Sequence, residues 1–147
     1  MTQPPCHRRP TLLVVGCGDV GMRVLKLLRG RWRLLALTST PARFAELRAA
    51  GAVPLLGNLD DASTMSRVGA LADAVLHLAP PPGQGANDPR TAHLLQVLAR
   101  AGRVKRLVYA STTGVYGDAG GAQFDETRPV APGSDRARRR VDAEQRL

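Results

Sequence analysis

Three glycines with the spacing of a phosphate-binding turn stand near the start of the chain, in VVGCGDVG at Gly16, Gly18 and Gly21. Such a spacing is weak evidence alone and gains meaning where it joins a buried strand to a helix. Gly16 would allow the tight turn, Gly18 the approach of a pyrophosphate, and Gly21 close packing of helix on strand. The first backbone N–H groups of the helix, at Asp19 and Val20, would face the phosphates. We predict a dinucleotide site; the alternative is a turn that serves packing only.

The residues after the second predicted strand bear on the choice between NAD and NADP. NAD sites place an Asp or Glu about 20 residues beyond the glycines, where it binds the ribose hydroxyls. Here the stretch is TSTPAR, with Thr38 at that place and no acid between Gly21 and Glu46. Thr38, Ser39 and Arg43 can bind a 2′-phosphate, which an acid would repel. We predict NADP as the cofactor and NAD as the second choice; the alternative is that these residues only cap the next helix.

The elements that must position these residues alternate between strand and helix patterns. Short apolar runs predict five strands, at 11–15, 33–38, 52–57, 72–79 and 106–111. Capping residues and glycines predict helices between them and after the last one. Such alternation is typical of right-handed βαβ units. We therefore predict an α/β fold with a doubly wound parallel sheet of the Rossmann type, strand order 3-2-1-4-5, in three α/β/α layers.

Boundary signals mark the individual helices of this fold. In the first helix, apolar residues share one helical face at Val20, Val24, Leu27 and Leu28. The second begins at Thr40 and Pro41 and ends at Gly51, and Asp60 or Asp61 caps a third. The remaining two run from Asp88–Pro89 to Gly102 and onward from about Ser134. We assign 11–147 to one domain and expect 1–10 to be disordered.

Composition limits the classes of function. The 147 residues are 44% hydrophobic and 3% aromatic, which suits one globular domain with a core of Leu, Val and Ala. No apolar run is long enough to cross a bilayer, and the first residues lack a secretory signal pattern. We expect a cytoplasmic protein with no membrane partner. Cys6 and Cys17 match no zinc or redox spacing, so we expect two free thiols and no metal site.

The net charge of +9 at pH 7 raises the question of nucleic-acid binding. Of the 21 basic residues only Lys26 and Lys105 are lysines, and the arginines are scattered along the chain apart from RARRR at 136–140. Nucleic-acid-binding proteins usually cluster their basic residues and add stacking or base-reading elements. An arginine-rich composition explains the charge. We do not expect a nucleic-acid partner; binding through the basic tail is the alternative.

The chain resembles the extended short-chain dehydrogenase/reductases, the NAD-dependent epimerase/dehydratase family. The resemblance rests on the glycine turn and on RLVYASTTGVYGD at 106–118, FDETRPVAPGS at 124–134 and DAE at 142–144. It implies that Asn58 and Leu59 flank the adenine. It also implies that Leu78, Ala79 and Pro80 wall the ribose on the nicotinamide side. The implied activity is hydride transfer at a nicotinamide, acting on a nucleotide sugar or a similar hydroxyl or carbonyl compound.

The same resemblance implies a catalytic Ser or Thr, then a Tyr and a Lys in the pattern Y-x-x-x-K. Thr112 fills the first slot, where its hydroxyl would bind the reacting oxygen; the alternative is that it satisfies the turn backbone. Arg136 and Arg140 fill the other two, so the usual hydride-transfer apparatus is incomplete. Arginine does not act as an acid or base at neutral pH, although Arg140 can still face the dinucleotide. Tyr116 is either a substitute acid or a packed loop residue.

Two functions from different classes remain open. One is the NAD(P)-binding domain of an atypical reductase or epimerase with a small-molecule substrate. The other is a non-catalytic NADP-binding scaffold or redox sensor that acts through a protein partner. Family members continue beyond the position of Leu147, so we expect either a fragment lacking a C-terminal region or a truncated protein that needs a partner, such as a homo-oligomer.

Two further features are ambiguous from sequence alone. His77 and His93 have no acidic partner at a useful spacing, and we expect them to be structural. The loop APPPGQG is either rigid beside the cofactor or a mobile lid with Gly83 and Gly85 as hinges.

Overall fold

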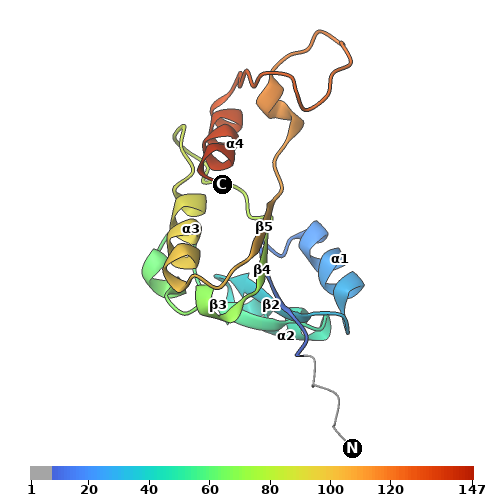
Figure 1. The fold of residues 1–147 in the computed structure, drawn as a ribbon, viewed down its shortest axis with the longest axis vertical. Coiled ribbons are helices and arrows are strands. Elements are labelled where there is room, and N and C mark those ends of the chain that lie inside the picture. Colours follow the sequence, from blue (N-terminus) through green and yellow to red (C-terminus); the bar gives the residue numbers. More distant parts are fainter. Residues whose placement is uncertain (1–7) are drawn as a thin grey trace, which may run out of the picture.

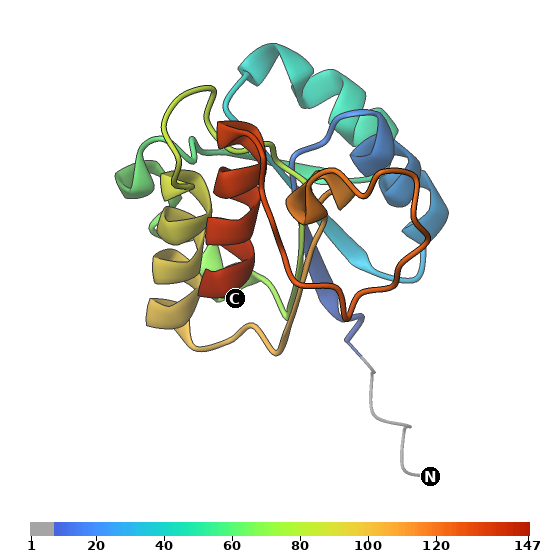
Figure 2. The ribbon, with the colours of Figure 1, turned by 90° about the horizontal axis from the view of Figure 1, so that it is seen from above.

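The computed structural model describes residues 8–147 as an open parallel sheet with helices on both faces (Figures 1 and 2). The strands are β1 (Thr11–Val15), β2 (Arg33–Thr38), β3 (Val53–Leu56), β4 (Ala74–His77) and β5 (Arg106–Tyr109). The helices are α1 (Asp19–Leu28), α2 (Phe44–Ala49), α3 (Pro89–Ala101) and α4 (Asp135–Arg146). Short 3₁₀ turns occupy Pro41–Arg43, Ala62–Met65, Gly69–Leu71 and Thr113–Tyr116.

The sheet has the strand order β3-β2-β1-β4-β5, and every neighbouring pair is parallel. This confirms the predicted fold class and strand order. Residues 1–7, on which Cys6 and most of the expected disordered segment fall, lie outside the described residues. Within the described part of the chain, no helix combines the length and the apolar character that crossing a membrane requires.

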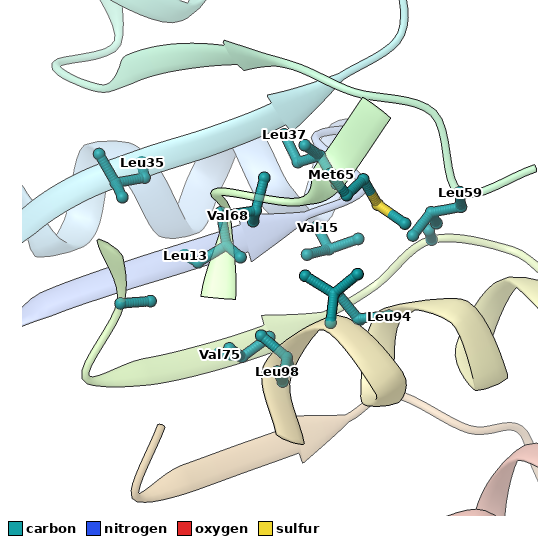
Figure 3. Packing of buried hydrophobic residues seen from close by; sticks show 13 residues of the cluster. Leu13, Val15, Leu35, Leu37, Leu59, Met65, Val68, Val75, Leu94 and Leu98 are labelled. Atoms are coloured by element: carbon teal, nitrogen blue, oxygen red, sulfur yellow. The ribbon is translucent and has the colours of Figure 1, made fainter. Parts of the chain in front are cut away.

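The core consists of two apolar clusters, one on each face of the sheet, and together they bury every residue of β1. Successive side chains of a strand point to opposite faces. Leu13 and Val15 therefore join the cluster that packs against α3, seen close by in Figure 3. Leu12 and Val14 join the cluster that contains buried residues of α1 and α2. Burial on both faces explains why this strand is an uninterrupted apolar run.

The boundaries of α3 and α4 agree with the capping signals. The Asp88 carboxylate accepts a hydrogen bond from the Thr91 N–H at 3.1 Å, and Pro89 takes the first helical position. Gly102 ends α3 in a left-handed conformation with φ of 61°. Ser134 caps α4. These boundaries were predictable because each depends on residues within one helical turn.

Helix α1 buries a different face from the one marked by its apolar residues. Val20 is 60% exposed and Leu27 is 74% exposed, whereas Gly21 and Leu25 are buried. The cause is the close approach at Gly21, where an added Cβ would lie 2.7 Å from the Gly16 carbonyl oxygen. Contact at this glycine fixes the roll of the helix, so the more apolar face is left partly in solvent.

Candidate dinucleotide site

A cleft of about 310 Å³ opens where β1, β2, β3 and β4 end. In open α/β sheets, ligands bind outside the carboxyl ends of the strands, where the strand order reverses. Eight predicted site residues line the cleft and come from four separate segments: Gly16, Gly18, Thr38, Ser39, Arg43, Asn58, Leu59 and Ala79. The fold thus gathers them at the edge that the topology favours for a ligand.

The glycine turn has the shape of a phosphate cradle. Gly16 adopts φ of 93°, and an added Cβ would lie 2.4 Å from the Ala79 nitrogen, so a side chain there is excluded. At Gly18 the opposite holds, because no atom lies within 4 Å of the position of an added Cβ. Helix α1 begins directly after Gly18, which provides no side-chain cap. Its first N–H groups, at Asp19 and Val20, are therefore available to an anion.

The end of β2 brings hydroxyls and one guanidinium to the cleft. Thr38, Ser39, Thr40 and Arg43 all line it. Thr40 stands at the predicted cap position, but its side chain accepts no helix hydrogen bond; instead its N–H donates to the Thr38 hydroxyl at 3.2 Å. The structure therefore does not support the alternative in which the Thr40 side chain caps the helix. Arg43 forms an ion pair with Glu46: its Nε donates a hydrogen bond to Glu46 Oε2 at 3.0 Å, and its Nη2 lies 3.0 Å from the same oxygen.

The loop after β3 is shaped by hydrogen bonds within itself and to α3. The Asn58 N–H donates to the Thr64 hydroxyl at 2.8 Å, and the Asn58 side chain accepts from the Asp60 N–H at 3.0 Å. Leu59 is buried, and His93 Nδ1 lies 2.8 Å from its carbonyl oxygen. The hydrogen bond from His93 agrees with the structural role expected for this histidine.

Two charged residues of the cleft were missed by sequence reasoning. Asp60 and Arg90 both line it, and they form an ion pair with a shortest distance of 2.6 Å. They are 30 residues apart, and no motif links them.

Cys17 was also missed as a lining residue; it is a free thiol, and burial raises its pKa to about 11. At neutral pH this thiol is protonated.

Leu78 and Pro80 flank Ala79 in sequence but do not line the cleft. The Pro80 carbonyl instead accepts a hydrogen bond from Arg90 at 3.3 Å. The loop that follows is attached to α4, because the buried Arg139 donates to the Gly85 carbonyl oxygen. This hydrogen bond favours the rigid alternative for the APPPGQG loop over a freely hinged lid.

The residues at the catalytic slots lie apart from the cleft lining. The Thr112 hydroxyl accepts a hydrogen bond from the Gly114 N–H at 3.3 Å, which is the turn-satisfying role considered above. Arg136 is exposed, and Arg140 contacts Tyr109 at the end of β5. Tyr116 packs edge-on against a neighbouring aromatic ring, with centroids 5.1 Å apart. This contact agrees with the alternative of a packed loop residue.

A buried polar chain lies between β4 and α3. The Thr91 hydroxyl donates to the Asp88 carboxylate at 2.7 Å, so it can only accept from His77 Nε2, which lies 2.9 Å away. His77 is 1% exposed, and burial lowers its pKa to about 4. The imidazole is therefore neutral with its proton on Nε2. Among residues 8–147, no three histidine, cysteine or acidic side chains form a group that could hold a metal ion.

The parallel sheet, the glycine turn and the cleft at the strand ends together define a dinucleotide-binding domain of the Rossmann type. A family model described as NAD(P)H-binding matches residues 16–145. The chain belongs to this NAD(P)H-binding family, within the short-chain dehydrogenase/reductase and NAD-dependent epimerase/dehydratase superfamily, which confirms the resemblance stated above. A search of curated proteins finds no match to this sequence.

Solved structures similar to this chain agree with that assignment. A functionally unknown conserved protein from Silicibacter pomeroyi DSS is 35% identical, with a TM-score of 0.73 over 92% of this chain and 47% of the other. A short-chain dehydrogenase/reductase superfamily protein from Agrobacterium tumefaciens with bound NAD is 26% identical, with a TM-score of 0.75 over 92% and 43%. A dTDP-glucose 4,6-dehydratase from Streptomyces venezuelae, with NAD and TYD bound, is 28% identical, with a TM-score of 0.76 over 92% and 49%. The chain thus spans about half the length of these proteins.

Proposed function

We propose that residues 11–147 form the NADP-binding domain of a cytoplasmic reductase or epimerase that acts on a nucleotide sugar or a similar hydroxyl or carbonyl compound. The similarity to a dTDP-glucose 4,6-dehydratase supports the substrate class. The bound nicotinamide would supply or accept hydride. The protein would supply the binding site, the orientation of the cofactor and the exclusion of water.

The proposal rests on the difference between the crowded surroundings of Gly16 and the open space beside Gly18. A side chain at Gly16 would collide with the backbone of Ala79, and this contact brings the ends of β1 and β4 together. Gly18 faces open space beside the N-terminus of α1. A pyrophosphate fits that space because the helix N–H groups and the helix dipole both favour an anion there.

The preference for NADP rests on the charges at the end of β2. Arg43 lines the cleft beside the end of β2, and its present partner is Glu46, three residues further along the chain. The pair is partly exposed, with side-chain exposures of 32% and 52%, so it contributes little and can be displaced. A 2′-phosphate carries more charge than the Glu46 carboxylate and would compete well for the guanidinium.

Calorimetric titration with NADPH and with NADH tests this proposal. We expect NADPH to bind more tightly than NADH, and Arg43→Ala to weaken NADPH binding alone. Arg48→Ala is the matched control, because Arg48 is an exposed arginine of α2 outside the cleft lining. Equal affinities for the two cofactors, or an equal loss of both in Arg43→Ala, would contradict the preference for NADP. Failure of both cofactors to bind would contradict the proposed function itself.

Thr112 is the remaining candidate for contact with the reacting oxygen of a substrate. Its oxygen accepts from the Gly114 N–H, which leaves the hydroxyl hydrogen to donate to a substrate oxygen. Arg140 would reach a cofactor ribose only after releasing Tyr109. A turnover assay that uses nucleotide-sugar substrates and follows NADPH absorbance tests the hydride-transfer activity. Turnover that falls in Thr112→Val, with NADPH affinity unchanged, is the expected result.

A further inference from the structure

Arg90 connects two loops that border the cleft. From the first turn of α3, its Nε donates to Asp60 Oδ1 at 2.6 Å and its Nη2 to Asp60 Oδ2 at 2.7 Å. Its Nη1 donates to the Pro80 carbonyl oxygen at 3.3 Å. Asp60 belongs to the loop after β3 and Pro80 to the loop after β4. One side chain therefore holds three segments in a fixed arrangement.

The geometry of the pair is specific to arginine. Two parallel N–H groups facing two carboxylate oxygens form a bidentate pair, which lysine, with its single ammonium group, cannot reproduce. The hydrogen bond from Arg90 lowers the pKa of Asp60 and raises that of Arg90, so both stay charged over the physiological range. The side chains are 28% and 51% exposed, and ion pairs with such exposure contribute little to global stability. The local arrangement of the two loops is the larger consequence.

The pair lies at the adenosine end of the cleft. The ribose next to the adenine is bound at the end of β2 in folds of this kind. The end of β3 is adjacent, because the Gly57 N–H donates to the Thr38 carbonyl at 3.0 Å. The adenine extends away from the pyrophosphate, so it meets the loop that begins at Asn58 and contains Asp60. Arg90, which also lines the cleft, holds that loop through its two hydrogen bonds to Asp60.

We propose that Arg90 is a positioning residue for the adenosine half of the cofactor. By holding the loops after β3 and β4 together, it keeps the adenosine slot formed before the ligand arrives and so reduces the entropy lost on binding. This inference rests on the proposed function. It differs from the role of Arg43, because all three Arg90 nitrogens are engaged, by both Asp60 carboxylate oxygens and by the Pro80 carbonyl, whereas Arg43 contacts a single Glu46 oxygen. Loss of Arg90 should therefore weaken NADPH, NADH and ADP by the same factor.

Calorimetry with Arg90→Lys tests the affinity part of the proposal. We expect the dissociation constants for NADPH, NADH and ADP to rise together by about tenfold. The double variant Asp60→Asn/Arg90→Lys should bind no more weakly than the weaker single variant, since the two residues act as one unit. Arg138→Lys is the matched control, because Arg138 forms an ion pair with Asp135 on α4 outside the cleft lining. Its affinities should equal those of the unsubstituted protein.

Amide hydrogen exchange of the unliganded protein tests the loop arrangement separately from cofactor binding. In Arg90→Lys the amides of 57–61 and 78–86 should exchange faster, whereas those of β1 should not change. Unchanged exchange in both loops would overturn the proposal, as would unchanged affinity for ADP. A fall in β1 protection equal to that in the loops would assign Arg90 to global stability and would also overturn it. If the unsubstituted protein binds none of the three ligands, the proposed function fails, and the exchange measurement still decides whether Arg90 holds the loops.

Discussion

The Arg140 guanidinium donates a hydrogen bond from Nη1 to the Tyr109 hydroxyl at 2.8 Å. The same nitrogen donates to the Ala110 carbonyl at 2.9 Å, and the guanidinium carbon lies 5.4 Å from the centre of the Tyr109 ring. These contacts connect α4 to the end of β5. Arg140, which occupies the lysine position of the family pattern, therefore binds Tyr109 and Ala110 of its own chain.

Replacing Arg140 separates a structural role from a cofactor role. We expect Arg140→Met to lower the free energy of unfolding by roughly 2 kcal/mol, because a charge-assisted hydrogen bond and the support of the Tyr109 ring are both lost. Tyr109→Phe should cost about 1 kcal/mol and serves as the matched partner variant. NADPH affinity should stay within about twofold in both. Unchanged denaturant unfolding together with a large loss of NADPH affinity would instead place Arg140 on the cofactor.

Alanine at Gly16 and alanine at Gly18 should have different effects. We expect Gly16→Ala to destabilise the fold by about 2–4 kcal/mol, because the residue has a positive φ and the new Cβ would overlap the Ala79 backbone. Gly18→Ala should cost at most about 1 kcal/mol of stability, because Gly18 is the N-cap of α1, where alanine is less favourable than glycine. It should weaken NADPH binding by about tenfold or more, because its Cβ enters the phosphate space. Thermal unfolding and calorimetry measure the two effects. Gly83→Ala, at another glycine with open surroundings, is the control for both.

Glu46→Gln should improve NADPH binding. The substitution removes the carboxylate that pairs with Arg43 and leaves the guanidinium free for a 2′-phosphate. We expect affinity for NADPH to rise by about threefold at low salt and NADH affinity to stay the same. The gain should shrink at 0.5 M salt, where exposed charges are screened at about 4 Å. Glu126→Gln, an exposed acid in a distant loop, is the control; an equal gain there would mean that only net charge matters.

Stability should fall as the pH is lowered from about 6.5 to about 4 because of His77. Burial holds its pKa near 4 in the folded protein, against 6.5 for an exposed histidine. The unfolded chain therefore binds the proton first, and the folded state loses on the order of 3 kcal/mol across this window. Asp60 and Asp73 have pKa values lowered from 3.8, so their contributions begin to be lost below about pH 5 and continue to fall below pH 4.

Denaturant unfolding between pH 4 and pH 7 measures this slope. His77→Gln removes the titrating group and keeps a donor for the Thr91 hydroxyl, so its stability should be nearly independent of pH between about pH 5 and pH 7. His93→Gln is the control variant. A slope in His77→Gln as steep as in the unsubstituted protein would show that another group titrates.

The positions of the strands and the ends of α3 and α4 could be predicted because their signals are local, whereas the helix expected after Asp60 or Asp61 forms only as 3₁₀ turns at Ala62–Met65 and Gly69–Leu71. The apolar run 11–15, the Asp88–Pro89 start and the Gly102 end each act within a few residues, and all agree with the structure. The buried face of α1 was not predictable in this way. Its roll depends on the contact between Gly21 and the Gly16 carbonyl, which outweighs the burial of Val20 and Leu27.

The amino-acid sequence was enough to predict a doubly wound sheet with a glycine turn between the first strand and the first helix. Alternating apolar periods, caps and glycines specify such elements over short distances along the chain. The contacts between polar side chains that are distant in sequence became known only from the three-dimensional fold. The hydrogen-bonded pairs Asp60–Arg90 and Tyr109–Arg140 are separated by 30 and 31 positions in the sequence. The buried His77 contacts Thr91, which lies 14 positions further along the chain. Such contacts depend on strand order, helix roll and side-chain direction together, and no short pattern in the sequence encodes all three.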